Sequence, residues 1–236
     1  MFNTLFYKPL YNGLVYIIDI IPNHDAGIAV VLLTLIVSII LFSISKKSIR
    51  TQIVLKEIEP ELKAIKEKTK DPTEQARQTM DLYKKYKINP FSIIFLMLIQ
   101  FPILIALYYV FFRGLPTIHT EYLYSFVKNP DTVNMIFLGI VDIGKKSVVL
   151  AVFAGVTQYI QAHIMSLKIQ KIDPNKKKTI QEEFAHSMQM QIKYVLPFVV
   201  GLIATNLPGA LPLYWTVRNI FTVFQEIYVQ KSMKSK

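Results

Sequence analysis

The chain contains no cysteine and few charged residues. Without cysteine it can form no disulfide framework, thiolate nucleophile, Cys-ligated zinc site or iron–sulfur cluster. Only 18% of the 236 residues are charged, whereas 52% are hydrophobic. The hydrophobic residues fall in long blocks, and runs of about 18 to 20 apolar residues match the hydrocarbon core of a bilayer. The composition therefore favours an all-α polytopic membrane protein over a soluble domain.

Five apolar blocks are predicted to cross the membrane as helices. They cover residues 27–45, 90–112, 148–165, 188–206 and 211–228. Pro102 lies inside the second block, and a membrane helix tolerates proline better than a soluble helix does. The turn Asn206-Leu-Pro-Gly209 separates the last two blocks and predicts a tight helical hairpin between them.

Lysine and arginine are concentrated in three stretches of the sequence. Residues 46–89 hold 12 of them, residues 167–193 hold 6, and the tail after Gln225 holds 3, which is 21 of the 27 in the chain. Loops rich in Lys and Arg stay on the cytoplasmic side of a membrane. The pattern predicts an N-terminus outside and a C-terminus in the cytoplasm, which five spans satisfy.

The segment of residues 1–24 is apolar enough to resemble a signal peptide, but no small-residue cleavage site follows an uninterrupted apolar core. Phe2, Phe6, Leu10 and Leu14 recur near helical spacing, with polar residues between them. An amphipathic helix in the interface on the outer side of the membrane is therefore favoured over a retained signal anchor or a sixth span.

The charged stretch of residues 51–86 is predicted to form a cytoplasmic helical hairpin. Apolar residues alternate with Lys and Glu from Thr51 to Lys70, and a second amphipathic segment covers residues 73–86. Asp71-Pro72 supplies a turn and a helix start between them. The alternative is a solvated connector, but structureless loops of this length are unusual.

Three short motifs resemble those of a known family. Asn89-Pro90, Gln100-Phe-Pro102 and Ala106-Leu-Tyr-Tyr109 resemble the second core span of the YidC/Oxa/Alb membrane protein insertases. Residues 208–219 resemble the last hairpin and fifth core span of that family, and residues 59–66 resemble the start of its cytoplasmic hairpin. The motifs occur in the family's order, and the resemblance covers about residues 2 to 232, so the chain resembles the minimal five-span core of bacterial members.

The resemblance implies a function without covalent chemistry. Insertases of this family hold a hydrophilic groove among five helices, open to the cytoplasm and to lipid, which accepts the polar tail of a nascent membrane protein. A wet groove shortens the path that polar groups must take through hydrocarbon, where each unsatisfied backbone group costs several kcal/mol. The implied location is the bacterial plasma membrane, and no catalytic residue, metal or cofactor is expected. The implied partners are nascent membrane proteins and the bilayer, with the ribosome and the Sec translocon as further candidates.

The groove's charge is predicted to lie at an unusual position. Most bacterial members carry an arginine in the first core span, where this chain has Ser38, whereas Arg218 lies in the fifth predicted span. Trp215, Arg218, Thr222 and Gln225 recur at helical spacing and form one stripe. We therefore expect the groove cation to have moved from the first span to the fifth. The alternative is an arginine that reaches an interface or pairs with an acid.

Further polar residues within the predicted spans are weaker candidates for the groove, because such side chains also bond their own backbone or join helices. They are Thr34, Gln100, Gln158, Gln161 and Asn219.

Other functional classes explain the sequence less well. A small transporter or channel for an anionic solute is the main alternative, since an arginine in a polar stripe could bind an anion, but the sequence shows no internal repeat. A serine protease would have to use Ser38 with His163, without the turn that activates such a serine. The four histidines lack the His-Glu-x-x-His spacing of a metalloprotease. The basic residues are interspersed with acids, which disfavours recognition of a specific nucleic acid sequence.

Overall fold

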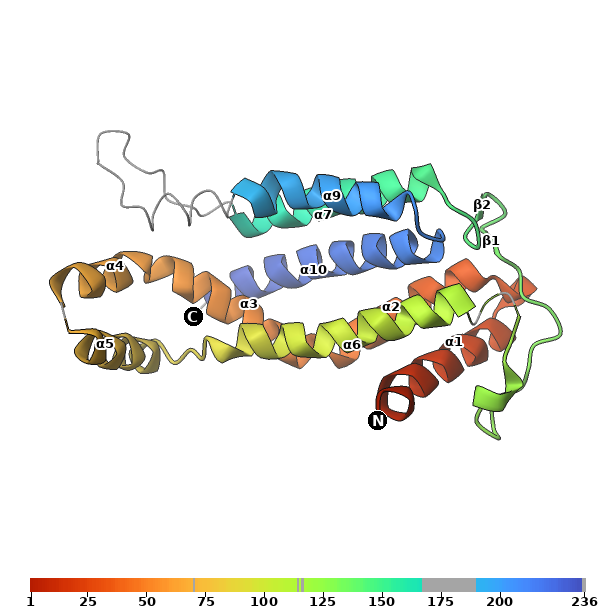
Figure 1. Ribbon diagram of the computed structural model, residues 1–236, viewed down its shortest axis with the longest axis horizontal. Helices are drawn as coiled ribbons and strands as arrows, with labels where there is room; N and C mark the ends of the chain where they lie inside the picture. The colour runs from red at the N-terminus through yellow and green to blue at the C-terminus, as the bar shows by residue number, and fades with distance from the viewer. Residues whose placement is uncertain (70, 114, 116, 167–189, 235–236) are drawn as a thin grey trace. The chain divides into compact units, whose positions relative to one another are not determined.

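The computed structural model describes residues 1–69, 71–113, 115, 117–166 and 190–234, which are mostly helical (Figure 1). The α-helices are α1 (Lys8–Ile20), α2 (Ala26–Ile40), α3 (Phe42–Glu57), α4 (Glu59–Lys68), α5 (Pro72–Lys85), α6 (Phe91–Arg113), α7 (Val148–Ser166), α9 (Leu196–Ala204) and α10 (Ala210–Lys234). Short π-helical turns precede α1 (Asn3–Tyr7) and α9 (Gln191–Val195). Two strands, β1 (Ile136–Phe137) and β2 (Val141–Asp142), pair antiparallel.

The chain divides into two compact units. The first unit contains Met1–Ile40 and Phe101–Val223, and the second contains Leu41–Gln100 and Phe224–Lys236. The division passes through the sequences of α6 and α10, so each of these helices contributes to both units. The prediction of a single core domain over residues 1–236 stays a prediction.

In the first unit, α7, α9 and α10 are packed through small residues. A Cβ atom on Gly155 would lie 3.4 Å from the Cα of Gly201, so the backbones of α7 and α9 approach closely because neither position carries a side chain. Ala151, Ala154 and Ala204 form a buried cluster against which Trp215 of α10 packs. The predicted hairpin between the last two helices is confirmed, because α9 ends at Ala204 and α10 begins at Ala210.

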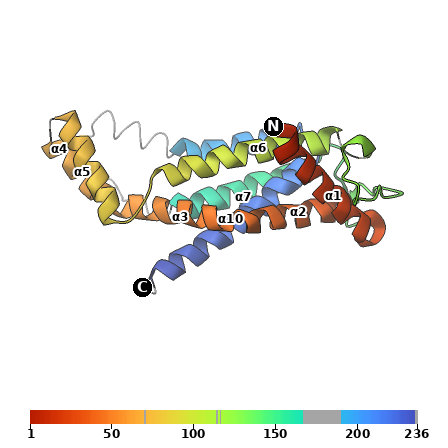
Figure 2. The same ribbon diagram turned by 90° about the horizontal axis from the view of Figure 1, so that it is seen from below.

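The N-terminal helix α1 packs on α2 in the same unit (Figure 2). Tyr11, Leu14 and Ile18 are fully buried along one face of α1, whereas Tyr16 and Ile20 are exposed. The helix predicted within residues 1–24 is therefore present. Its place in a membrane interface stays a prediction.

The long loop (residues 117–147) joins α6 to α7 and is fixed to the starts of two helices. Asp25 caps α2 by accepting hydrogen bonds from the amides of Gly27 (2.8 Å) and Ile28 (3.0 Å), and it accepts a third from the amide of Leu138 in the long loop (2.8 Å). The amide of Gly209, just before α10, donates to the carbonyl of Lys145 (2.9 Å). These bonds hold the β1–β2 hairpin against the first unit's helices.

In the second unit, α4 and α5 form the predicted cytoplasmic hairpin. Asp71 caps α5 by accepting from the Thr73 amide (3.0 Å). Leu82 of α5 is buried in a cluster with Val54 and Ile58. Glu61 of α4 accepts a hydrogen bond from the Tyr86 hydroxyl and pairs with Lys85 at 3.1 Å. The hairpin itself is thus present, and its cytoplasmic location stays a prediction.

Two predicted boundaries are wrong. The first span was expected to run unbroken over residues 27–45, but α2 ends at Ile40 and a new helix begins at Phe42. Just after this break the Ile44 amide donates a hydrogen bond to the carbonyl of Leu41, only three residues earlier. The Ser45 hydroxyl donates to the carbonyl of Phe42. Both bonds depart from the regular α-helical pattern, in which an amide donates to the carbonyl four residues earlier.

The first arm of the cytoplasmic hairpin was expected to begin at Thr51. Residues 51–57 instead belong to α3, and the helix is broken at Ile58 before Pro60. Proline has no backbone N–H and collides with the carbonyl four residues earlier, so a helix cannot continue through it without distortion.

Only part of the predicted membrane topology is supported by helix length and hydropathy. Within the described ranges, Phe91–Phe112 is long and apolar enough to cross a membrane, and α2 with α3 would add a second span if they are counted as one bent helix. Val148–Ile164 and Lys193–Ala204 are apolar but shorter. Residues 188 and 189 of the predicted fourth span lie outside the described residues. The count of five spans stays a prediction.

Candidate functional site

The charged centre of the candidate site joins α10 to α2. The Arg218 guanidinium donates a hydrogen bond from Nη1 to the Ser38 hydroxyl oxygen at 3.1 Å. Ser38 is 1% exposed, whereas Arg218 is half-buried. These residues are 180 positions apart in the sequence, and both belong to the first unit. The two positions between which the groove cation was predicted to have moved are therefore in contact.

Two hydroxyl groups close to this pair in the sequence are bonded within their own helices. Thr34 donates to the carbonyl of Val30 at 2.6 Å, and Thr222 donates to the carbonyl of Arg218 at 2.9 Å. A hydroxyl that has donated its proton can still accept a hydrogen bond. The hydroxyl protons of Thr34 and Thr222 are thus used within their own helices, and their oxygens can still accept.

Trp215 and Asn219 lie on α10 like Arg218, but they contact α7, whereas Arg218 contacts Ser38 of α2. Trp215 packs on the buried alanine cluster of α7 and α9. The Asn219 amide nitrogen lies 3.3 Å from the Thr157 hydroxyl and 3.5 Å from the carbonyl of Ala154, both on α7. The predicted stripe on α10 therefore includes residues that join helices as well as the arginine.

The remaining candidates lie on three helices. Gln158 and Gln161 of α7 are half-buried in the first unit. Gln100 and Gln225 belong to the second unit, where the Gln225 amide donates to the Ser45 hydroxyl at 2.9 Å. Gln225 is 3% exposed, and its carbonyl oxygen has no hydrogen-bond partner among the described residues.

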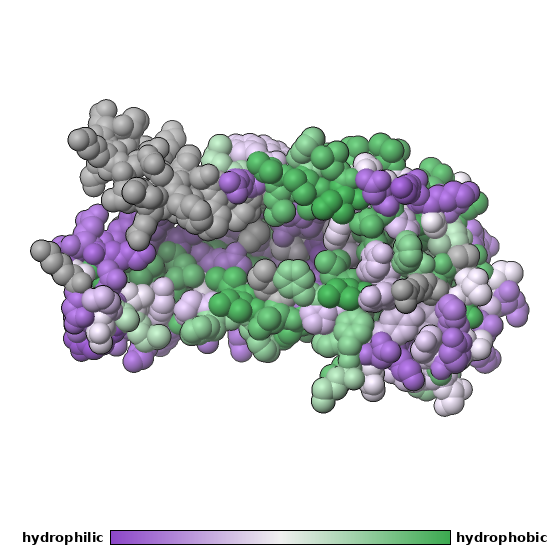
Figure 3. Space-filling view, viewed as in Figure 1, coloured by the Kyte–Doolittle hydropathy of each residue, from purple (hydrophilic) through white to green (hydrophobic). Residues whose placement is uncertain are grey.

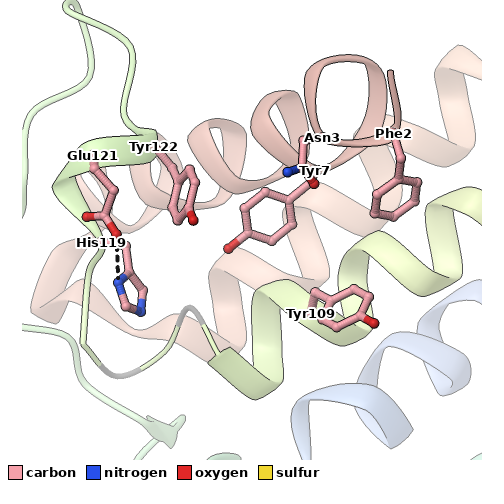
Figure 4. A pocket seen from close by; sticks show the side chains of 7 residues that line it. All are labelled: Phe2, Asn3, Tyr7, Tyr109, His119, Glu121 and Tyr122. Atoms are coloured by element: carbon pink, nitrogen blue, oxygen red, sulfur yellow. Dashed lines mark ion pairs between the residues drawn. The ribbon is translucent and has the colours of Figure 1, made fainter.

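An aromatic hollow that the sequence did not predict lies beside α1 in the first unit. It has a volume of about 420 Å³ and is lined by Phe2, Asn3, Tyr7, Tyr109, His119, Glu121 and Tyr122. Figure 4 shows the Glu121 carboxylate directed toward the His119 ring, and the distance from Nδ1 to Oε1 is 3.2 Å. Its lining combines residues more than 100 positions apart, so no local motif marks it.

The wall of this hollow is fixed by buried polar contacts from α1. Asn12 donates to the carbonyl of Tyr122 (2.9 Å) and accepts from the amide of Tyr124 (2.6 Å). The Tyr11 hydroxyl accepts from the amide of His119 (2.7 Å). Burial raises the pKa of Tyr11 to about 12, so this phenol remains a neutral hydrogen-bonding group at physiological pH.

The surface over α7 and α9 is hydrophobic (Figure 3). Phe153 of α7 and Phe198 of α9 are 54% and 67% exposed, and Val152 and Leu202 beside them are also exposed. A contiguous apolar surface of this kind marks contact with a membrane or a protein.

Comparison with known proteins agrees with the helical architecture and the apolar surface. The sequence model of the family described as 60Kd inner membrane protein matches residues 18–236. The chain belongs to this family. A "Membrane protein insertase YidC" from Clostridium tetani is 35% identical over 213 residues, which cover 89% of this chain and 84% of the relative. The protein of the same name from Oceanobacillus iheyensis is 29% identical over 100% of this chain and 86% of the relative.

A longer relative, the "Membrane protein insertase YidC" from Geotalea uraniireducens, is 29% identical over 97% of this chain, but this match covers only 38% of the relative.

Membership of the family places the chain in the bacterial inner membrane. The comparisons give no support to the anion transporter that the sequence left as an alternative.

Proposed function

We propose that this protein is a membrane protein insertase that uses no covalent chemistry. Support comes from the relatives in Clostridium tetani and Oceanobacillus iheyensis, both named as insertases. The match to this chain covers 84% and 86% of their lengths. The substrates would be nascent membrane proteins, whose apolar helices are released into the bilayer. The N-terminus would lie outside and the C-terminus in the cytoplasm, as the distribution of Lys and Arg predicts.

The observation that carries the mechanism is the hydrogen bond between Arg218 and Ser38. An arginine in the middle of a membrane helix costs at least about 2.5 to 3.5 kcal/mol, so it is retained where it faces water or polar protein groups. Ser38 provides one polar partner, and Arg218 remains half-buried rather than enclosed. We infer that the pair lines a hydrophilic groove, into which Arg218 attracts the polar or acidic tail of a substrate.

Several candidate residues support the groove in different ways. Thr34 and Thr222 would offer hydroxyl oxygens near the pair, while Trp215 and Asn219 would hold α10 against α7. Gln158 and Gln161 of α7, and Gln100 and Gln225 of the second unit, are further candidates for polar contacts with the substrate. Contact with the ribosome is proposed for the basic stretches of residues 46–89 and 167–193, of which 167–189 lie outside the described residues. The Sec translocon is a further proposed partner.

The charge of Arg218 is tested with an acidic-tailed single-span substrate whose insertion is measured by protease protection in cells. We expect Arg218→Ala to lower insertion about tenfold, a loss of roughly 1.4 kcal/mol, and Arg218→Lys to retain most of it because the attraction is long-ranged. Arg77→Ala removes the same side chain from the exposed hairpin, where Arg77 pairs with Glu74, and serves as the control at matched abundance.

Two further experiments test the role of Arg218 in the groove separately from the insertase function. The double variant Ser38→Arg with Arg218→Ser should recover part of the loss, because the two positions are in contact. If Arg218→Ala inserts the acidic-tailed substrate as well as the parent does, the proposed role of the cation is wrong. If the parent chain cannot replace a depleted host insertase at all, the insertase proposal itself is wrong.

A further inference from the structure

A second hollow, in the second unit, is strongly basic. It has a volume of about 320 Å³ and is lined by Lys46, Arg50, Val229, Ser232 and Met233. Lys46 and Arg50 come from α3 and the other three residues from α10, and both contributing segments lie in the second unit. Val229 is buried with Ile49 and Ile53, which gives the hollow an apolar floor beneath its charged rim.

The positive charge of this hollow is not compensated within the described residues. Lys46 and Arg50 are four positions apart, so they share one face of α3 and repel each other. Neither has a carboxylate within ion-pair distance in the described part of the chain. The Lys46 ammonium lies 5.3 Å from the centre of the Tyr228 ring, which leaves its charge intact.

The acid nearest to the hollow along α10 is Glu226, three residues before Val229. It is 4% exposed, accepts a hydrogen bond from the Gln230 amide at 3.1 Å, and does not line the hollow. The two cations therefore face a space in which an anion would relieve their repulsion.

We propose that this hollow binds the phosphate of an anionic lipid headgroup. Arginine presents a planar fork of donors to phosphate, and lysine adds a mobile point charge. The Ser232 hydroxyl can donate a third hydrogen bond. Val229 and Met233 offer an apolar wall to the glycerol and first acyl carbons, which a free inorganic phosphate would not use. Basic pockets between helices of membrane proteins bind such headgroups.

The position of the hollow in the chain favours a lipid over a soluble phosphate compound. Lys46 follows the last residue of the apolar helix α2 by six positions, at most about 9 Å along a helix. Phe42 and Tyr228 lie close by, with ring centres 6.0 Å apart. Aromatic rings followed by Lys and Arg are typical of the boundary between hydrocarbon and water. A headgroup would reach the hollow at this boundary.

The test measures lipid retained by the purified full chain with native mass spectrometry after extraction from nanodiscs. The discs contain equal amounts of phosphatidylglycerol and phosphatidylcholine with the same acyl chains. We expect the parent to retain phosphatidylglycerol preferentially. The variant K46Q/R50Q should retain about thirtyfold less, because it removes two cations that each attract an anionic headgroup. The control K47Q/K66Q removes two charges from exposed positions outside the hollow and should behave as the parent.

Competition with soluble phosphate compounds tests whether the bound phosphate belongs to a lipid. Millimolar inorganic phosphate or a short RNA should displace little of the lipid. The lipid proposal is overturned if K46Q/R50Q and K47Q/K66Q lose the same amount, or if either soluble competitor displaces the lipid fully. Thermal unfolding of each variant in detergent checks that the fold is kept. Should K46Q/R50Q unfold, the single variants K46Q and R50Q decide the matter. Lipid retention does not depend on insertion, so its outcome is independent of the proposed function.

Discussion

The long loop and the α4–α5 hairpin are held in place by different kinds of interaction. The long loop accepts and donates buried hydrogen bonds through Asn12 and Asp25, which are 2% and 5% exposed. The hairpin has one buried apolar residue, Leu82, around which other apolar side chains are only partly buried, and its polar contacts, such as Glu61 with Lys85, are exposed. Buried polar contacts are costly to leave unmade, whereas exposed ion pairs contribute little. The long loop should therefore be rigid and the hairpin locally labile.

The largest effect is expected from Asp25→Ala. The change removes the cap of α2 and leaves three amide groups without their acceptor, so the free energy of unfolding should fall by about 3 kcal/mol. Chemical unfolding in detergent measures it. Asp19→Ala removes a carboxylate near the end of α1 and should cost less than about 0.5 kcal/mol. Equal costs for the two variants would contradict the rigid attachment of the long loop.

The next effect is steric and concerns Gly27. A Cβ at this position would lie 2.4 Å from Cδ2 of Phe137, so Gly27→Ala should force the β1–β2 hairpin away from α2 and cost about 2 kcal/mol. The double variant Gly27→Ala with Phe137→Gly should cost less than the sum of the single changes, because the side chain that the new Cβ would meet is gone. Strict additivity of the unfolding free energies would show that the two positions do not meet.

The hairpin should show the opposite behaviour. Hydrogen exchange of α4 and α5 is expected to be faster than that of α7 and α9, since Leu82 is the one buried residue of these two described helices. Glu61→Gln should accelerate exchange in α4 and α5 further while the midpoint of global unfolding stays unchanged. Protection of the hairpin equal to that of α7 would remove the distinction between the two regions.

The smallest effect is a local response of the hairpin to acid. Hydrogen bonds from Tyr86 and Lys85 hold the pKa of Glu61 below its usual value. This contribution to hairpin stability is present above the ordinary pKa of a glutamate and is lost as the pH falls through the lowered pKa of the folded state. Exchange in α4 should therefore accelerate on acidification, and Glu61→Gln should abolish that step. Arg77 and Gln78 lower the pKa of Glu74 to about 2, so its contacts should persist to stronger acid.

Local sequence predicts those parts of the fold that depend on neighbouring residues. The blocks at 90–112 and 148–165 correspond to α6 and α7 almost to the residue, and Asn206–Gly209 does form the turn before α10. The same local reasoning could have placed the helix break before Pro60. It could not place the break at Leu41, because no proline or glycine marks it and only hydroxyl contacts accompany it.

The sequence by itself determined the class of the protein, because apolar block length, the distribution of Lys and Arg, and turn residues act over short distances. It also singled out Ser38 and Arg218 as positions of interest. Only the tertiary structure decided which side chains meet: Arg218 with Ser38, Asn12 with Tyr122, and Asp25 with Leu138. It also decided that Trp215 serves packing against α7 and α9. The three pairs join residues more than 100 positions apart. Such pairs depend on how helices pack, which no local periodicity encodes.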